Sequence, residues 1–330
     1  MSNNYSCCNG CGDYCKITIP AVKLVFHIKA LASGHMPYYA GSVLRGMIGK
    51  EIRNLSCVNK DAQCEHCPYI RNCAYGKLFE PLSSVFAPEL TKTQLYLTPP
   101  FVIEAPFFPE QQWEKDEIKP FQLIIFGDAL HYIHYFIESL FFIAETGLGK
   151  QRIPFVIERI EQYLENGETV KLLHDDTVLY DRLQETNFSW ETEQNCINKI
   201  LINIETPLRI QEEGQIVRGF NVELFLKNCE RRLQFFKKAY GIVLECSNAG
   251  FCHFANNIKM THKHIAWTDW ERYSSRNKKT MNLGGILGSF QLEGGVLTSV
   301  LPLLQFASFA HIGKQTVFGL GKFTIWKELS

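Results

Sequence analysis

The sequence predicts an α+β protein in which two βαββαβ units follow one another, the order of secondary structure found in ferredoxin-like (RRM-like) domains. The chain has 330 residues, 46% of them apolar, which is enough for a substantial core, and its length favours two domains. Segments with β-branched alternation are interspersed with amphipathic helical segments, and the order of these segments is repeated once.

The first unit is expected over residues 17–162, after a cysteine-rich extension at residues 1–16. Apolar residues recur at helical spacing over 39–54, and the helix expected at 128–145 has Asp128 as its N-cap and ends at Gly147. The strands of this unit are expected at 17–33, 93–97, 101–107, 120–126 and 155–160.

The second unit is expected over residues 198–330, after an acidic, weakly patterned connector at 163–197. Its helices are predicted at 220–240 and 296–310. Its strands are predicted at 199–209, 263–270, 283–292 and 322–326.

Charge is distributed unevenly along the chain, although the formal net charge is zero. Residues 151–195 contain 4 Lys and Arg against 10 Asp and Glu, whereas residues 231–330 contain 13 against 5. The basic C-terminal third is suited to a phosphate-bearing partner, although a solvated basic surface explains the charge equally well. No apolar run is long enough to span a bilayer and no secretory signal is expected, which indicates a cytoplasmic protein without membrane partners.

A glycine-rich stretch near the C-terminus joins the last helix to the last strand. It reads His311-Ile-Gly-Lys-Gln-Thr-Val-Phe-Gly-Leu-Gly-Lys322. Glycines let backbone N–H groups approach an anion, and the two lysines supply positive charge. The stretch is not a dinucleotide or nucleoside-triphosphate fingerprint, because it precedes a strand. A purely structural turn is the alternative.

This stretch resembles the C-terminal glycine-rich loop of the CRISPR-associated RAMP superfamily, and of its Cas6 family of CRISPR RNA-processing endoribonucleases in particular. The resemblance extends over roughly residues 20–327. The other segments that carry it are Pro37-Tyr-Tyr-Ala-Gly-Ser-Val-Leu-Arg-Gly46, Phe126-Gly-Asp, Gly147-Leu-Gly149, Thr206-Pro-Leu-Arg209, Trp270-Glu-Arg-Tyr-Ser-Ser-Arg276, Gly284-Gly285 and Gly288.

The resemblance implies two ferredoxin-like domains that bind CRISPR repeat RNA and cut precursor CRISPR RNA. The reaction it implies is attack by a ribose 2′-OH on the adjacent phosphate, which gives a 2′,3′-cyclic product without a catalytic metal. Family members place a catalytic histidine between the first strand and the first helix, where this chain has His35 beside Tyr38 and Tyr39. His311, which opens the glycine-rich loop, is the second candidate.

A non-catalytic RAMP subunit that holds guide RNA among other Cas effector subunits is the alternative function. It has the same fold and the same loop, so the residues expected to contact RNA are shared by both functions. These residues are Arg45, Arg272, Tyr273, Arg276, Gly313, Lys314, Gly319, Gly321 and Lys322.

Four of the twelve cysteines lie within a short segment directly after the first helix, namely Cys57, Cys64, Cys67 and Cys73. A disulfide framework is typical of small secreted domains, so metal ligation is the better explanation. The CxxC pair at the centre favours a structural zinc ion, with an iron–sulfur cluster as the alternative. His66 could replace one thiolate.

Other cysteines and histidines form weaker candidate metal sites. Cys7, Cys8, Cys11 and Cys15 could bind a second metal ion. A third site could use residues drawn from Cys246, Cys252, His253, His262 and His264. His131, His134 and Glu138 share a helix face, where a polar stripe is the expected explanation.

Overall fold

The computed structural model describes residues 14–90, 95–246, 250–269, 271–274 and 279–329. The chain forms two compact units. Unit 1 contains the described residues up to Thr18, Ser189–Lys237 and the residues from Ile242 onward, and unit 2 contains Ile19–Phe188 and Lys238–Gly241. The segment 163–197, expected as a connector, carries several short strands and contributes to both units.

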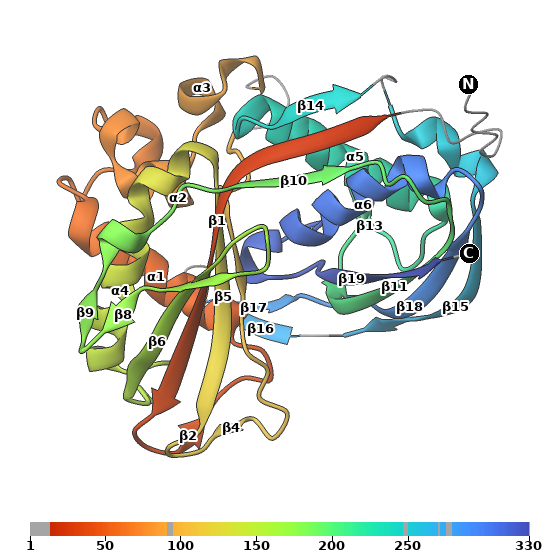
Figure 1. The fold of residues 1–330 in the computed structure, drawn as a ribbon. Helices are drawn as coiled ribbons and strands as arrows, with labels where there is room; N and C mark the ends of the chain where they lie inside the picture. The colour runs from red at the N-terminus through yellow and green to blue at the C-terminus, as the bar shows by residue number, and fades with distance from the viewer. Residues whose placement is uncertain (1–13, 91–94, 247–249, 270, 275–278, 330) are drawn as a thin grey trace. The chain divides into compact units, whose positions relative to one another are not determined.

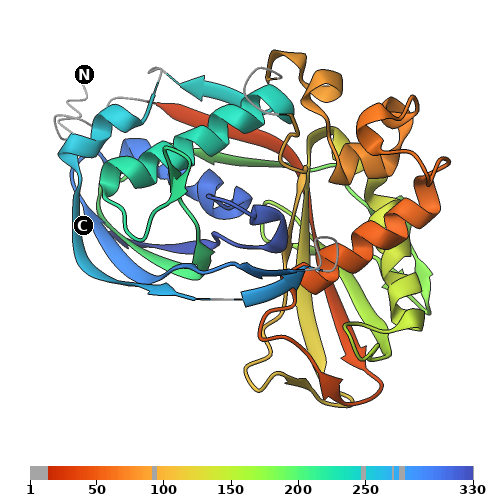
Figure 2. The same ribbon diagram turned by 180° about the vertical axis from the view of Figure 1, so that it is seen from behind.

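Unit 2 is built on an antiparallel sheet with the order β3-β5-β1-β6-β7. Helices α1 (Gly41–Ser56) and α4 (Ile133–Thr146) lie on one face of this sheet (Figures 1 and 2). The strands are β1 (Cys15–Ala30), β3 (Phe101–Glu104), β5 (Ile118–Phe126), β6 (Phe155–Tyr163) and β7 (Thr169–Lys171).

The two helices pack on the sheet because each has an apolar stripe at helical spacing. In α1 the stripe includes Leu44, Ile48 and Ile52, and all three side chains are fully buried. The stripe of α4 is buried in the same way, at Ile133, Phe136, Ile137, Leu140 and Ile143.

Short elements complete unit 2. They are β2 (Gly34–His35), β4 (Gln112–Trp113), α2 (Ala74–Phe79), α3 (Ser83–Phe86), β8 (Leu173–His174), β9 (Thr177–Val178) and β10 (Asn187–Glu191), which runs into unit 1, together with 3-10 turns at Cys64–His66, Ile70–Asn72, Pro88–Leu90, Gly127–Tyr132 and Tyr180–Arg182.

The predicted start of helix α4 is wrong, and its predicted end is confirmed. A 3-10 turn over Gly127–Tyr132 precedes α4, so the N-cap position belongs to Tyr132 and not to Asp128. Gly147 ends the helix with φ +84°, a conformation that favours glycine. The strand expected at 93–97 lies partly outside the described residues, and Tyr96 forms an isolated bridge with Leu82.

Unit 1 is built on a second antiparallel sheet with the order β15-β18-β11-β19. Its strands are β11 (Ile197–Leu208), β15 (Lys259–Thr268), β18 (Gly285–Glu293) and β19 (Phe323–Leu329). Helices α5 (Val222–Ala239) and α6 (Leu297–Ala310) lie on one face of it (Figures 1 and 2). Smaller elements are β12 (Gln211–Glu212), β13 (Gln215–Ile216), β14 (Val243–Cys246), β16 (Glu271–Ser274), β17 (Lys279–Asn282) and 3-10 turns at Cys252–Asn257 and Thr316–Phe318.

Aromatic packing and one buried arginine hold the helices of unit 1 on their sheet. Phe225 of α5 contacts Phe290 of β18 and Phe323 of β19, with ring centroids 5.2 and 5.6 Å apart. Arg232 of α5 is buried, and its guanidinium donates two hydrogen bonds, of 3.3 and 2.8 Å, to the carbonyl of Ala310 at the end of α6. This contact satisfies a helix-terminal carbonyl immediately before the glycine-rich stretch.

The predicted α+β class with antiparallel sheets is confirmed. The principal strands and helices occur where the sequence predicts them, within a few residues, except for the strand at 93–97. Among the described residues, no helix is both long enough and apolar enough to cross a membrane.

Candidate functional site

The glycine-rich stretch, residues 311–322, forms a loop in unit 1 that packs against the end of strand β11. The N–H of Lys314 donates to the carbonyl of Arg209 at 2.9 Å, and the N–H of Gly321 donates to the carbonyl of Pro207 at 3.2 Å. A third hydrogen bond, 3.3 Å from the N–H of Ile312 to the carbonyl of Gly321, closes the loop on itself. Several of the loop's backbone groups are therefore engaged within the protein.

Two glycines of this loop occupy positions that a larger residue cannot adopt without strain. Gly313 has φ +87°, and a Cβ there would lie 2.6 Å from the carbonyl oxygen of Arg209. Gly321 has φ +74°, and a Cβ there would lie 1.8 Å from the carbonyl oxygen of Ile312. Close packing of backbone on backbone is thus what these two glycines make possible.

Thr206 anchors the loop, and sequence reasoning assigned it no role. Its hydroxyl donates to the carbonyl of Gly319 at 2.7 Å and accepts from the N–H of Lys322 at 2.9 Å. The residue is 2% exposed, and the bond to the Gly319 carbonyl is buried. The sequence feature that could have identified this residue is a threonine next to a proline in a predicted strand.

The two lysines of the loop are placed differently. Lys314 is exposed, and in the part of the chain that the structure describes no carboxylate pairs with it. Lys322 is half-buried, with its ammonium 3.2 Å from the carboxylate of Glu205. Lys314 therefore offers the loop's uncompensated positive charge to solvent.

His311 points into unit 1 and has no exposed surface. Its Nδ1 lies 3.3 Å from the carbonyl oxygen of Leu320, and its backbone has φ +57°. A side chain in this place does not reach a phosphate in solvent while the loop keeps this conformation. A catalytic role for His311 stays a prediction, and the burial favours a structural role.

His35 is exposed in unit 2, in the short strand β2. It pairs with Gln112 of β4, and its backbone N–H donates to the side-chain carbonyl of Gln151 at 2.7 Å. Backbone contacts thus position the residue and leave its imidazole accessible to a ligand.

The two tyrosines next to His35 in the sequence differ sharply. Tyr38 is 49% exposed and its ring meets the edge of Phe107. Tyr39 is 5% exposed, and burial raises the pKa of its phenol above the ordinary value. The hydroxyl of Tyr39 also accepts a long hydrogen bond, 3.4 Å, from the N–H of Ala105. Of the two, Tyr38 is the one whose side chain can meet RNA.

The remaining predicted RNA contacts lie apart from the loop in the sequence. Arg45 is half-buried on α1, with its guanidinium 5.0 Å from the centre of the Phe79 ring. Arg272 and Tyr273 lie on β16, opposite Met281 and Thr280 of β17, and Arg276 lies outside the described residues. Their RNA contacts stay predictions.

The cysteines predicted to bind zinc, Cys57, Cys64, Cys67 and Cys73, are unpaired and half-buried. Burial raises the pKa of the Cys64 thiol, and the neighbouring Glu80, Cys73 and Cys57 raise it further. Within the described ranges, no three His, Cys, Asp or Glu side chains converge as a metal site. The four-thiolate zinc site therefore stays a prediction.

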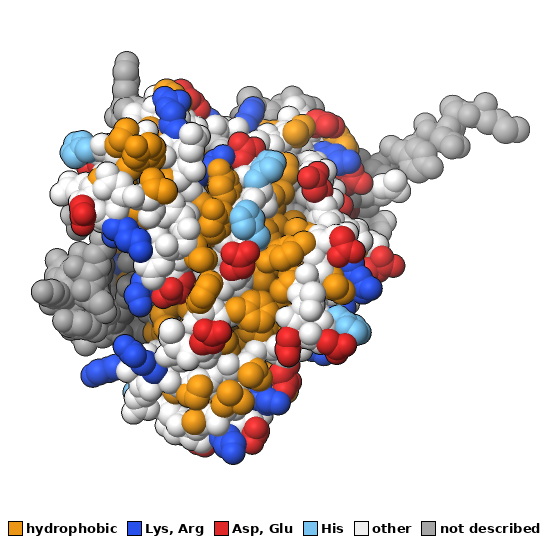
Figure 3. Space-filling view, turned by 90° about the vertical axis from the view of Figure 1, so that its left-hand side faces the viewer, with side chains coloured by type: hydrophobic (Ala, Val, Ile, Leu, Met, Phe, Trp, Pro, Cys, Tyr) orange, Lys and Arg blue, Asp and Glu red, His pale blue; other side chains and the backbone are white. Residues whose placement is uncertain are grey.

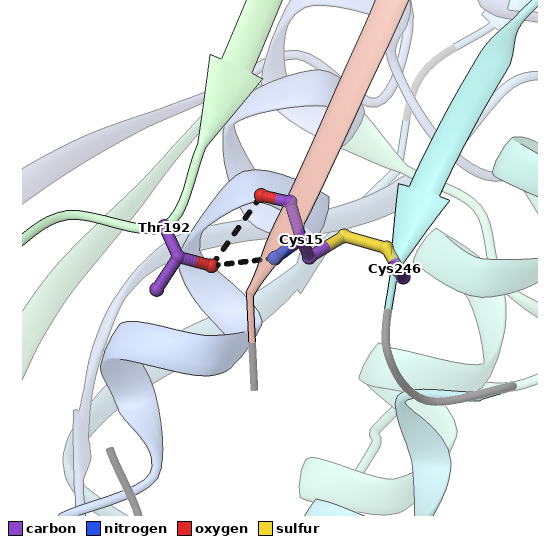
Figure 4. The surroundings of a disulfide bond; sticks show 3 residues. All are labelled: Cys15, Thr192 and Cys246. Carbon is purple, nitrogen blue, oxygen red and sulfur yellow. Dashed lines mark hydrogen bonds between the residues drawn. A yellow bond between two sulfur atoms is a disulfide. The ribbon is translucent and has the colours of Figure 1, made fainter. Parts of the chain in front are cut away.

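A disulfide corrects the interpretation of two other cysteines. Cys15 of β1 is bonded to Cys246 of β14, directly across the strand pair, and the Thr192 hydroxyl contacts the backbone of Cys15 (Figure 4). Neither sulfur is a thiolate in this structure, so the second and third candidate metal sites lose one member each. Cys252 donates to the carboxylate of Glu230 at 2.7 Å, and Cys7, Cys8 and Cys11 lie outside the described residues.

The histidines of α4 and of the turn before it belong to a mixed surface. His131 and Glu138 are exposed, and the ring of His134 lies 4.3 Å from that of Tyr135. Figure 3 shows histidine, acidic and hydrophobic side chains next to one another on the face toward which α4 lies in Figure 1. A polar and aromatic stripe describes these residues, as the sequence indicates.

Comparisons with known proteins match both halves of the chain. Residues 202–323, which include the whole glycine-rich loop, match the family model of the CRISPR-associated endoribonuclease Cas6. Residues 202–323 therefore form a Cas6-family segment of the chain. A second family model, described as an N-terminal domain, matches residues 19–187. No curated protein sequence matches the chain significantly.

Solved structures of Cas6 proteins share the fold at low identity. A partial Cas6-RT-Cas1–Cas2 complex is 14% identical with a TM-score of 0.52, over 94% of this chain and 47% of that chain. Against the chain of a Cas6-RT-Cas1–Cas2 complex the coverage is 29%, so this chain spans less than half of either. Two other structures are matched almost end to end. A Cas6 product complex is 12% identical with a TM-score of 0.51, over 93% of this chain and 99% of that chain. Thermus thermophilus Cas6 is 12% identical with a TM-score of 0.50, over 94% of this chain and 99% of that chain.

We predict that Gly321→Ala destabilises the protein by more than about 2 kcal/mol, because strain at positive φ adds to the clash with the Ile312 carbonyl. The matched control is Gly295→Ala, where a Cβ meets nothing within 4 Å. Denaturant midpoints of the two variants measure the difference. Equal midpoints would contradict the close packing of the loop.

Proposed function

We propose that this chain is a Cas6-family endoribonuclease that binds CRISPR repeat RNA and cuts precursor CRISPR RNA. In the proposed reaction a ribose 2′-OH attacks the adjacent phosphate and leaves a 2′,3′-cyclic phosphate, with no catalytic metal. The observation that carries the proposal is the loop at 311–322, which lies inside the segment matching the Cas6 family model and presents an exposed Lys314. Side chains then supply the proton transfers and the charge stabilisation.

His35 is the residue we assign to proton transfer. It is exposed, it is held through backbone contacts, and imidazole changes charge near neutral pH, with an ordinary pKa of about 6.5. Tyr38, three residues away and half exposed, is suited to contact the same nucleotide. Tyr39 is assigned to packing, since its buried phenol has a raised pKa and stays neutral.

The RNA backbone is assigned to Lys314 and to the outer surface of the glycine-rich loop. The charge of Lys314 is not compensated by a carboxylate among the described residues, so it is available to neutralise a phosphate. The charge of Lys322 is partly compensated by Glu205. Arg45, Arg272, Tyr273 and Arg276 are proposed as further RNA contacts. A cytoplasmic location, suited to RNA processing, belongs to the same proposal.

We also infer that both units are ferredoxin-like. In unit 2 four neighbouring strands have the order β3-β5-β1-β6, and in unit 1 the four strands have the order β15-β18-β11-β19. When the four strands of each unit are numbered along the chain, their spatial order is the same in both sheets. It is second, third, first and fourth, with the second strand at the edge of the sheet. The helices of each unit follow the first and third of these strands, which supports one repeated βαββαβ plan.

Other Cas proteins are proposed as partners. The support is that two of the similar structures are Cas6-RT-Cas1–Cas2 complexes. A chain that binds guide RNA in such an assembly without cutting it is the competing function, and the cleavage experiments below separate the two.

We predict that His35→Ala lowers the single-turnover rate of repeat RNA cleavage by roughly 100-fold or more and leaves RNA affinity nearly unchanged. A proton-transferring imidazole acts on the rate, and a neutral imidazole makes few phosphate contacts. The control is His174→Ala, since His174 is exposed and pairs with Asp175 outside the candidate site. Full cleavage by His35→Ala would assign catalysis elsewhere, and binding without cleavage by the wild type would favour the non-catalytic subunit.

We predict that Lys314→Ala weakens RNA binding and reduces the log–log salt slope by somewhat less than one unit, as expected for one lost phosphate contact. Lys322→Ala should change the slope less, because Glu205 already compensates its charge. Lys171→Ala removes an exposed charge outside the site and serves as the control. Filter binding across a salt series measures all three. Identical slopes for the Lys314 and Lys171 variants would contradict the assignment.

A further inference from the structure

The loop between helices α1 and α2 has an unusual pattern of burial. It runs from Cys57 to Cys73, which is 17 residues. Eleven of them are exposed. The other six are half-buried or buried, and they are Cys57, Ala62, Cys64, Cys67, Ile70 and Cys73. All four cysteines of the loop are therefore among its few residues that are not exposed.

Such a loop has almost no apolar core of its own. Ile70 is its one buried side chain, whereas Val58 and Tyr69 are 79% and 56% exposed. Its regular structure consists of two 3-10 turns, Cys64–His66 and Ile70–Asn72. Small segments that cannot bury enough apolar surface are commonly held by disulfides or a metal ion. The half-buried side chains of the loop that could serve this purpose are thiols.

The two ends of the loop are fixed next to each other. Cys57 is the C-cap of α1 and Cys73 is the N-cap of α2. The hydroxyl of Ser56 accepts a hydrogen bond from the N–H of Tyr75 at 3.2 Å, which joins the neighbouring residues across the gap. This hydrogen bond links the two helix ends that carry Cys57 and Cys73.

A buried donor without a partner lies in the same neighbourhood. The Nε–H of Arg53 is buried and has no hydrogen-bond acceptor, while its NH2 donates to the carbonyl of Lys60 at 2.9 Å. Four thiolates around a divalent ion carry a net negative charge, and an N–H donor with a cationic group beside them is the expected outer partner.

We propose that Cys57, Cys64, Cys67 and Cys73 bind one structural zinc ion as a tetrathiolate centre that closes the loop between α1 and α2. The Cys64-x-x-Cys67 turn, closed by a 3.2 Å hydrogen bond from the N–H of Cys67 to the carbonyl of Cys64, supplies one pair of ligands. The adjacent helix ends supply the other pair. His66 is exposed, which assigns all four positions to sulfur.

Binding involves a local rearrangement. Within the described ranges the thiols do not yet converge on one point, so the four side chains must turn toward the ion and release their protons. The centre would hold α2 against the end of α1. The guanidinium of Arg45 lies 5.0 Å from the centre of the Phe79 ring of α2. The centre would therefore also help to position Arg45, a proposed RNA contact.

The experiment measures zinc, iron and acid-labile sulfide in tag-free, full-length protein purified without oxygen. Cys7, Cys8 and Cys11 are first changed to serine, so that the N-terminal cysteines contribute no metal. This background should carry about one zinc ion per chain and little iron. Adding Cys64→Ser and Cys67→Ser should remove the zinc and lower the denaturant midpoint. Adding Cys196→Ser instead, at a half-buried cysteine outside the loop, should leave the zinc content unchanged.

A second measurement protects the test against a loop variant that does not fold. Cobalt exchanged into the background protein should give the intense visible bands and thiolate charge-transfer absorption of a tetrahedral thiolate site. Absence of metal, zinc retained in the folded loop variant, or an octahedral cobalt spectrum would overturn the proposal. Iron with acid-labile sulfide would overturn the assignment to zinc. Disulfides between the loop cysteines would also overturn it, because a covalent link would then close the loop instead of a metal ion. None of these results depends on RNA cleavage.

Discussion

The glycine-rich loop depends on the close approach of its backbone at Gly321 to its backbone at Ile312. A Cβ at that position would lie 1.8 Å from the carbonyl oxygen of Ile312, so the chain turns back there only without a side chain. This closure decides which side chains of the loop face inward. His311 is buried, Lys322 is paired with Glu205, and Lys314 is exposed to solvent.

Polar contacts hold the loop once the glycines allow it to approach. Thr206 satisfies one carbonyl and one N–H of the loop, and Arg232 satisfies the carbonyl of Ala310 at the helix end just before it. Both side chains are buried, where an unsatisfied partner costs about 1–3 kcal/mol. The loop is therefore held in unit 1 by these contacts, while the proposed proton-transferring residue, His35, is positioned by backbone pairing in unit 2.

Periodicity predicted most of the fold because it reflects burial directly. The apolar stripes of α1, α4 and α5 and the alternation of β1 depend on local sequence alone. What periodicity missed depends on contacts between distant segments. The Cys15–Cys246 disulfide joins residues 231 positions apart, and the burial of His311 follows from the closure of the loop. Arg232 carried a detectable signal, since it is a charged residue within the apolar stripe of α5.

In the proposed reaction the protein cuts repeat RNA through the substrate's own 2′-OH. The most direct test compares two repeat RNAs that differ only in having ribose or 2′-deoxyribose at the cleavage position, in buffer containing EDTA. We expect the wild-type protein to bind both RNAs with similar affinity, to cut the ribose substrate to a 2′,3′-cyclic phosphate and to leave the deoxy substrate intact. Cleavage of the deoxy substrate at an equal rate would show that the 2′-OH is not the nucleophile.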